Sequence, residues 1–202
     1  NDVDVNFSTF ILGLANSTTG LIVALSAPVL GAIADRGSSR KKFLIFFAYV
    51  GVLATSMLFL LEKGQWISAS IFYGLGLIGF NAGNNFYDSL LPLIAGEKII
   101  DYISGLGYAF GYLGGGVLFS LNVLMTQKPV WFGLESAAEG CRYAFLSVGV
   151  WCGLFTVPLI IWVRERKKPV EKNGNPILSG FQEVFRTFRK IQMLRETFLF
   201  LV

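Results

Sequence analysis

The sequence predicts an all-α membrane protein. Of its 202 residues, 53% are hydrophobic and 15% are charged, and the charged residues gather in short segments. Between these segments lie five almost uncharged stretches, each long enough to cross a hydrocarbon core of about 30 Å as a helix. They are residues 11–34, 43–61, 67–87, 104–125 and 143–163. We therefore expect residues 1–163 to form five transmembrane helices.

The basic residues support this topology because they lie almost entirely on one side of the five spans. Of the 17 lysines and arginines, 14 fall in segments on one side and three, Lys63, Lys128 and Arg142, fall on the other. Cytosolic loops carry such an excess, so we expect residues 35–42 and the segment from Arg164 onward to be cytosolic. The cations follow membrane topology rather than one folded face, so nucleic acid is not an expected partner.

Residue types that build metal and catalytic sites are scarce. The chain has no histidine, which disfavours a zinc site or a histidine-based triad. Its two cysteines, Cys141 and Cys152, are separated along a helix by about 16 Å, beyond the reach of a disulfide. No paired carboxylates or nucleophile–base pair are visible in a span. We expect no metal, no cofactor and no enzymatic activity.

The five spans differ in polarity. Residues 43–61 and 143–163 are almost wholly apolar, and we expect them to face lipid over most of their circumference. The first span, residues 11–34, carries Asn16 among small polar residues, and Pro28 is expected to kink it near its cytosolic end. The first span is therefore a candidate for lining a solute cavity.

The third span carries the strongest polar signal. Its polar residues recur at helical spacing on one face, and they are Asn81, Asn84, Asn85 and Asp88. An amide without a partner is costly in lipid, so this face must look into the protein or a wet cavity. Hydrogen bonds between helices, each worth about 0.5–2 kcal/mol, are the simpler interpretation for any single asparagine. Three amides and a carboxylate together favour a cavity wall.

The fourth span is rich in glycine. Gly107, Gly111 and Gly115 recur every four residues and predict a flat strip against which another helix packs closely. Tyr108 and Tyr112 supply polar tips on the same span, and we include both among the cavity candidates.

The segment after the fifth span changes character. Residues 164–196 form a basic linker with an amphipathic stretch, in which Phe181, Phe185 and Phe188 lie on one helical face and Arg186 and Arg189 on the other. We expect a helix at the cytosolic membrane surface, with a soluble tail that docks on a partner as the alternative. Residues 197–202 are apolar again and are expected to begin a further, truncated span.

The loop between the first two spans resembles a known signature. It contains Gly31, then Asp35, Arg36 and Gly37, followed by a basic run of Arg40, Lys41 and Lys42. This order is similar to the loop that joins the second and third helices of major facilitator superfamily transporters. Ser38 and Ser39 depart from the pattern, and the resemblance implies a looser loop there.

Within that superfamily, three segments resemble the branch of vacuolar amino-acid effluxers of autophagy and their bacterial relatives. They are residues 28–37, 86–92 and 104–115. The resemblance implies that the spans are helices two to six of the N-terminal half, with the C-terminal half of the same chain missing. The two apolar spans then correspond to helices three and six, which are peripheral in the fold. An arginine that many proton-coupled relatives carry in helix four has no counterpart in residues 67–87, so coupling through it is in doubt.

The resemblance implies part of a secondary active transporter that moves a small polar solute, an amino acid, by alternating access. The expected conformational latch comprises Gly31, Asp35, Arg36, Gly37, Arg40 and Lys41, with Asp88 as a candidate partner for its cations. Topology anchoring alone is the favoured interpretation of the basic run, but not of Asp35, because a lone acid weakens an anchor.

The expected partners are a small-molecule solute and membrane lipid, and a coupling ion is left open. We expect a multi-pass protein of a bacterial inner membrane rather than a vacuolar one. A non-transporting membrane scaffold or sensor with the same fold is the alternative function.

Overall fold

A computed structural model describes residues 5–37, 39–62, 64–96, 99–165 and 189. The side chains of residues 5, 6, 32, 33 and 35–37 are outside this description. The amphipathic stretch and the apolar segment at residues 197–202 also lie outside the described residues, apart from Arg189.

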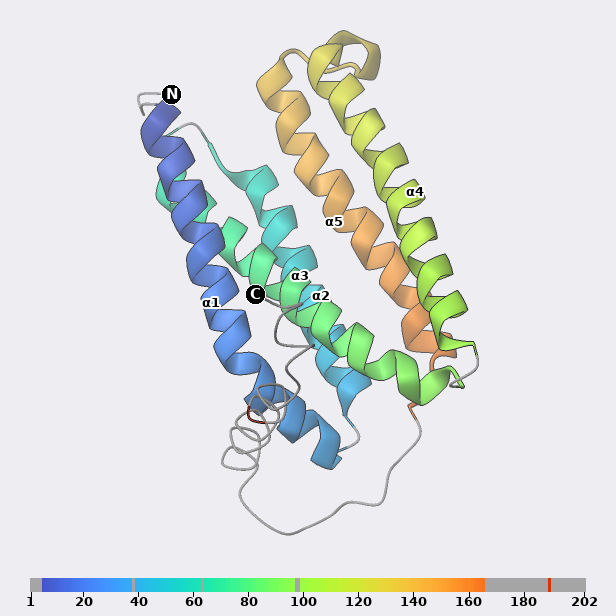
Figure 1. Cartoon of the computed structure of the whole chain (residues 1–202). Coiled ribbons are helices and arrows are strands. Elements are labelled where there is room, and N and C mark those ends of the chain that lie inside the picture. Colours follow the sequence, from blue (N-terminus) through green and yellow to red (C-terminus); the bar gives the residue numbers. More distant parts are fainter. Residues whose placement is uncertain (1–4, 38, 63, 97–98, 166–188, 190–202) are drawn as a thin grey trace.

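Five long helices and two short 3-10 turns make up the described part of the chain, and it contains no strand. The elements are α1 (Val5–Gly37), α2 (Arg40–Met57), η1 (Leu58–Leu60), α3 (Trp66–Ile94), α4 (Ile100–Gln127), η2 (Pro129–Phe132) and α5 (Ala137–Trp162). Successive helices run in opposite directions along the bundle (Figure 1). The last residues of α1, α3 and α5 therefore lie at the same end of the bundle as the first residues of α2 and α4. We call this end, which carries Arg40, Lys41 and Lys42, the basic end.

Local signals set the turn before α5. The Ser136 hydroxyl accepts a hydrogen bond of 3.2 Å from the backbone N–H of Glu139, whose carboxylate accepts one of 2.8 Å from the N–H of Glu135. The first bond satisfies one of the N–H groups that the start of α5 leaves without partners, and the second holds the chain just before the helix in place. Gly133 provides the left-handed backbone conformation, with φ of 73°, that ends η2.

Packing is centred on α2 and α3. α2 contacts α3 along most of its length and also contacts α5, while α1 packs on α3 and α4 packs on α5. The α2–α3 contact is a backbone contact at Gly51 and Gly79, where a Cβ added to Gly79 would lie 2.5 Å from the Gly51 nitrogen. Only glycine permits this approach.

The apolar interior of the bundle lies toward the basic end. Leu44 and Phe86 are buried there with Leu90 and Ala34, and the Phe86 ring stacks on Phe43 with centroids 5.2 Å apart. Stacked rings of this kind fix the position of α2 relative to α3.

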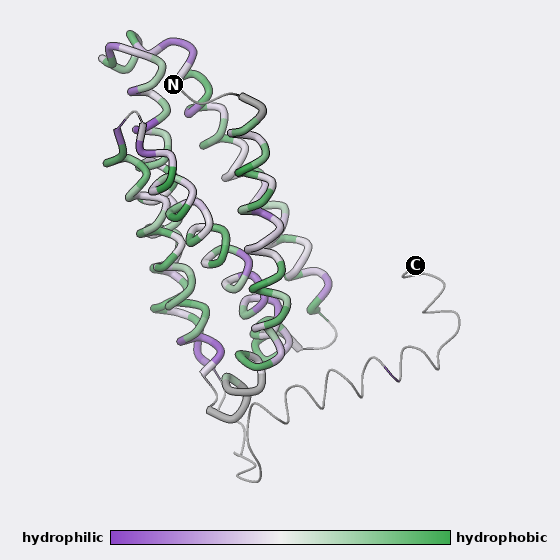
Figure 2. Tube along the Cα trace, turned by 90° about the vertical axis from the view of Figure 1, so that its left-hand side faces the viewer, coloured by the Kyte–Doolittle hydropathy of each residue, from purple (hydrophilic) through white to green (hydrophobic). Residues whose placement is uncertain are grey.

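Outside this interior, the surface is strongly apolar. α4 has no buried residue, and many large hydrophobic side chains are exposed on every helix. Hydrophobic residues run along the helices while hydrophilic ones gather mainly near the ends (Figure 2). Such a surface suits lipid and not water.

Four of the described helices are long and apolar enough to cross a membrane, namely Phe7–Gly31, Arg40–Leu60, Ile100–Gln127 and Ala137–Trp162. α3 is also long enough, with 29 residues, but its polar residues lower its mean hydropathy, and it is not among the four. The predicted all-α membrane fold is confirmed. α2, however, is more enclosed than the sequence predicts, because it lies against both α3 and α5 and exposes one stripe that includes Phe46, Tyr49 and Leu53. An apolar side chain packs equally well on a helix or on lipid, so apolarity alone does not distinguish the two.

Candidate functional site

The polar residues of α3 lie on one side of that helix, away from its packing face. Asn84, Asn85 and Asp88 are exposed and Asn81 is partly buried. Roughly opposite on the helix circumference, Gly79 and Leu90 are buried against α2. The structure thus keeps the four predicted residues together on the side of α3 that faces away from α2.

Asp88 is linked to α4. The Tyr108 hydroxyl donates a hydrogen bond of 3.5 Å to Asp88 Oδ1, which joins two of the predicted cavity residues across two helices. Tyr112, one turn further along α4, is 79% exposed. Asp88 is the predicted partner of the loop cations, but the contact that the structure describes for it is this one with Tyr108.

Asn16 is linked to α3 nearer the opposite end of the bundle. The Tyr73 hydroxyl donates a hydrogen bond of 3.1 Å to Asn16 Oδ1. Tyr73 is not among the residues that the sequence analysis singled out. Its hydroxyl, two turns into a membrane helix, is the signal that could have found it, because such a group needs a partner in lipid.

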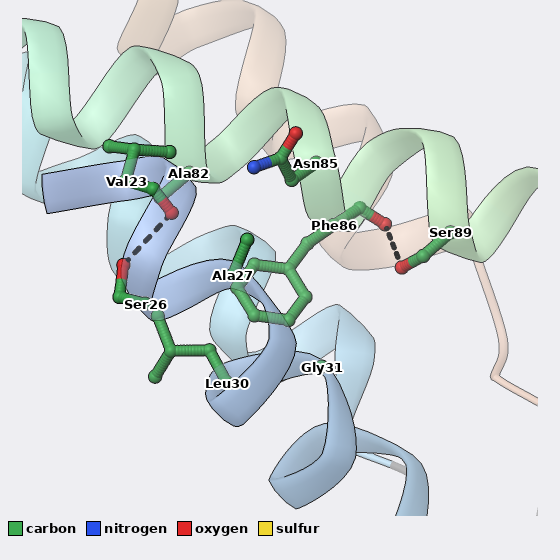
Figure 3. A pocket seen from close by; sticks show the side chains of 9 residues that line it. All are labelled: Val23, Ser26, Ala27, Leu30, Gly31, Ala82, Asn85, Phe86 and Ser89. Carbon is green, nitrogen blue, oxygen red and sulfur yellow. Dashed lines mark hydrogen bonds between the residues drawn. The ribbon is translucent and has the colours of Figure 1, made fainter. Parts of the chain in front are cut away.

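A small hollow of about 160 Å³ lies between α1 and α3 in their halves nearer the basic end (Figure 3). Its lining includes two predicted residues, Gly31 and Asn85, and two serines. The hydroxyl of Ser26 donates to the Val23 carbonyl and that of Ser89 to the Phe86 carbonyl, at 3.2 and 2.9 Å. The serine oxygens therefore remain acceptors, while the amide of Asn85 can both donate and accept.

A second, larger hollow of about 540 Å³ lies on the other side of the polar face. Residues of α2, α3 and α5 line it. The lining is apolar apart from Asn84, Tyr73 and two threonines. The polar face of α3 therefore stands between two hollows, with Asn85 at one and Asn84 at the other.

Within the described residues, the predicted glycine strip on α4 meets another helix only at Gly107, where an added Cβ would lie 2.6 Å from the hydroxyl of Tyr87 on α3. Space is open over Gly111 and Gly115. α4 instead approaches α5 through Gly114, which lies against the Trp151 side chain. Gly114 and Gly111 are only about 60° apart on the helix, and periodicity alone does not show which of these positions a neighbour uses.

The predicted latch residues divide between α1 and α2. Asp35, Arg36 and Gly37 form the last turn of α1, and nothing is described of their side chains. Arg40 and Lys41 begin α2, and their interactions are specific.

The backbone N–H groups of Arg40 and Lys41 share one acceptor, the carboxylate of Glu165. The N–H of Arg40 donates to Glu165 Oε1 at 3.0 Å, and the N–H of Lys41 donates to Glu165 Oε2 at 3.1 Å. Glu165 was missed by the sequence analysis, which treated residues from 164 onward as a basic linker. An acid directly after an apolar span and inside a basic run was the available signal.

The two side chains reach different helices. Lys41 Nζ donates to the carbonyls of Ile160 and Val163 at the end of α5, at 2.7 and 2.6 Å. The Arg40 guanidinium donates through Nη1 to the carbonyl of Ser89 on α3. Lys42, the next residue, is exposed. Arg40 and Lys41 therefore make specific contacts with other helices, which topology anchoring alone does not require.

Comparison with known proteins identifies the fold's relatives. A family model described as "Vacuole effluxer Atg22 like" matches residues 2–100 and 96–202. The chain is 33% identical over 198 residues to the uncharacterized MFS-type transporter YxiO of Bacillus subtilis, a match that covers 96% of this chain and 46% of that protein. It is 22% identical over 217 residues to autophagy-related protein 22 of Kluyveromyces lactis, covering 96% of this chain and 42% of that protein.

The chain thus spans about half the length, or less, of these curated relatives. No solved structure matches it. The predicted resemblance to the autophagy-effluxer branch of the major facilitator superfamily and its bacterial relatives is confirmed, and the chain belongs to the Atg22-like vacuole effluxer family.

Proposed function

We propose that this chain is part of a secondary active transporter that carries a small polar solute across a membrane by alternating access. One observation supports this most strongly: the polar face of α3, with its three asparagines and Asp88, is turned away from the helix that packs most tightly on it. Amides placed so in an apolar bundle are costly unless they meet water or a solute.

The solute class follows from the chemistry of that face. Asn81, Asn84 and Asn85 each offer donors and acceptors, and Asp88 adds one negative charge. The serine oxygens of the smaller hollow are acceptors only, because their protons are used on the backbone. This combination suits a zwitterion such as an amino acid, whose ammonium group needs acceptors and whose carboxylate accepts from the amides. The names of the relatives support efflux from a vacuole or transport in a bacterium.

In this proposal, the basic end faces the cytosol and residues 31–41 act as the latch on that side. Asp35, at the end of α1, is the residue proposed to hold this side closed by accepting hydrogen bonds or pairing with a cation. A bacterial inner membrane is the proposed location, since the bacterial relative is 33% identical to this chain and the yeast one 22%.

The test is flux into proteoliposomes that contain the full-length protein. The panel comprises leucine, lysine and glutamate, with lactate and glucose as solutes without an amino group. Uptake of an amino acid that unlabelled amino acid inhibits supports the proposal. Binding of an amino acid without flux would instead favour the second candidate, a non-transporting sensor with this fold, and neither binding nor flux would contradict both.

A matched pair of variants ties the flux to the polar face. Asn85→Leu removes one amide from the smaller hollow and is expected to raise the apparent KM about tenfold, because one hydrogen bond to a charged solute group is lost. Lys42→Ala, at an exposed position outside that hollow, is expected to leave it unchanged.

A further inference from the structure

The contacts at the basic end form a reciprocal clamp between two helix ends that are far apart in the sequence. The carboxylate of Glu165, just after α5, accepts the first two N–H groups of α2. The ammonium of Lys41, at the start of α2, donates to two carbonyls at the end of α5. Each helix therefore satisfies backbone groups that the other helix leaves without partners.

Neither helix end has such a cap of its own. Ser39 precedes α2, but its side chain makes no capping hydrogen bond, and α2 has no acidic residue in its first turn. α5 has no basic residue in its last turn. Glu165 and Lys41 supply the missing groups, and each has the sign that the helix dipole favours, negative at an N-terminus and positive at a C-terminus.

The clamp also positions a third helix. Glu165 holds the backbone of residues 40 and 41 in place, and from that backbone the Arg40 side chain extends to the Ser89 carbonyl of α3. Ser89 lines the smaller hollow and directly follows Asp88 on the polar face. On the other side of residue 40, the Ser39 N–H donates to the Ala34 carbonyl of α1 at 2.9 Å.

We infer that Glu165 is a positioning residue for the latch: it sets where residues 39–41 lie, and through Arg40 it holds the end of α3 beside the smaller hollow. Because Glu165 follows α5 closely, its carboxylate connects the end of α5 to the loop between α1 and α2. The inference deepens the proposed function, on which its transport readout rests, but its structural readout needs no solute.

The first experiment separates a helix-end clamp from an ordinary ion pair. Lys41→Glu and Glu165→Lys are made singly and together in the full-length protein, and thermal unfolding is followed in detergent. An ion pair would be restored in the double variant. A clamp would not be, because the swapped lysine would face the N-terminus of α2 and the swapped glutamate the C-terminus of α5, each with the wrong sign. Recovery of the parental Tm by the double variant would overturn the inference.

The second experiment measures position rather than stability. Ser89→Cys is introduced after Cys141 and Cys152 are replaced by serine and alanine, and its labelling by a membrane-impermeant thiol reagent is timed from each side of the vesicle. Glu165→Ala is expected to speed labelling from the side of the basic end about tenfold, the scale on which loss of a charged cap changes a local opening equilibrium. Glu165→Asp, which keeps the charge, is expected to recover at least part of the parental rate.

Matched controls keep the result interpretable. Lys42→Glu is the control for Lys41→Glu, and a cysteine at Ser70, which lies in the first third of α3 and nearer the opposite end of the bundle, is the control for position 89. Equal acceleration at positions 70 and 89 would indicate general loosening and overturn the positioning role, as would an unchanged rate at 89. If labelling shifts but the parental protein carries no solute of the panel, the positioning role stands and the proposed transport function fails.

Discussion

The hydroxyl of Tyr73 on α3 donates a hydrogen bond of 3.1 Å to Asn16 Oδ1 on α1, and the two residues are 57 positions apart in the sequence. α1 packs on α3 through small groups along the same seam, where the nearest atom to a Cβ on Gly74 would be Thr19 Oγ1 at 3.8 Å. Thr19 is itself buried. The hydrogen bond therefore sets the register of α1 on α3.

The first prediction concerns this hydrogen bond. Tyr73→Phe keeps the ring and removes the donor, and it should lower the free energy of unfolding by about 0.6–1.7 kcal/mol, the range found for hydrogen bonds between membrane helices. Tyr49→Phe, on α2, is the control, since its hydroxyl makes no described hydrogen bond. Denaturation in mixed detergent micelles measures both. Equal losses in the two variants would show that the Asn16 contact contributes nothing.

The second prediction concerns the α2–α3 contact. Gly79→Ala places a methyl group 2.5 Å from the backbone of Gly51, so the helices must separate, at a cost of about 1–3 kcal/mol. Gly83→Ala is the matched control one turn away, where the new methyl group would lie 4.0 Å from the Leu44 side chain. The yield of monodisperse protein and its Tm should fall for the first variant and stay near parental for the second. A normal Tm for Gly79→Ala would contradict the described packing.

The third prediction concerns access to the polar face. With both native cysteines replaced, a cysteine at Asn85 should react with a water-soluble thiol reagent, because the side chain is exposed at the smaller hollow. A cysteine at Ala54, on α2, 5% exposed and outside both hollows, should react at least about tenfold more slowly. Equal protection of the two positions in membranes would show that this face of α3 meets no water.

The fourth prediction concerns Asp35 in the last turn of α1. Asp35→Asn removes the charge with little change in volume and should slow transport about tenfold while the protein inserts normally, as expected when one charged contact of a closed state is lost. Flux per protein, with the protein quantified by immunoblot of the same vesicles, measures it. A parallel fall in protein and flux would point instead to a structural role.

Much of the fold is predictable because hydropathy marks the parts of helices that lie in lipid. The boundaries are not, and α3 continues to Ile94 although the predicted span stops at residue 87. α5 likewise begins at Ala137 and not at residue 143. A helix keeps its backbone hydrogen bonds beyond the hydrocarbon region, so its ends depend on caps such as Ser136 rather than on apolar composition.

The candidate site is predictable only where its residues share one helix. Asn81, Asn84, Asn85 and Asp88 follow from spacing alone. The contacts that join helices do not: an acid inside a basic run marks Glu165, but nothing local shows that its partner is the backbone of Arg40, 125 residues away. Long-range partners of this kind need the packing of whole helices before they can be assigned.

The contacts between helices differ in how closely the two backbones approach, and the glycines mark the difference. At Gly51 and Gly79 two backbones touch, so α2 and α3 cannot slide past each other without first moving apart, and the pair serves as a fulcrum. α1 meets α3 through side chains, and space is open over its glycines Gly13, Gly20 and Gly31. Any relative motion of these helices would therefore move α1 against the α2–α3 pair, and it would have to break the hydrogen bond between Tyr73 and Asn16.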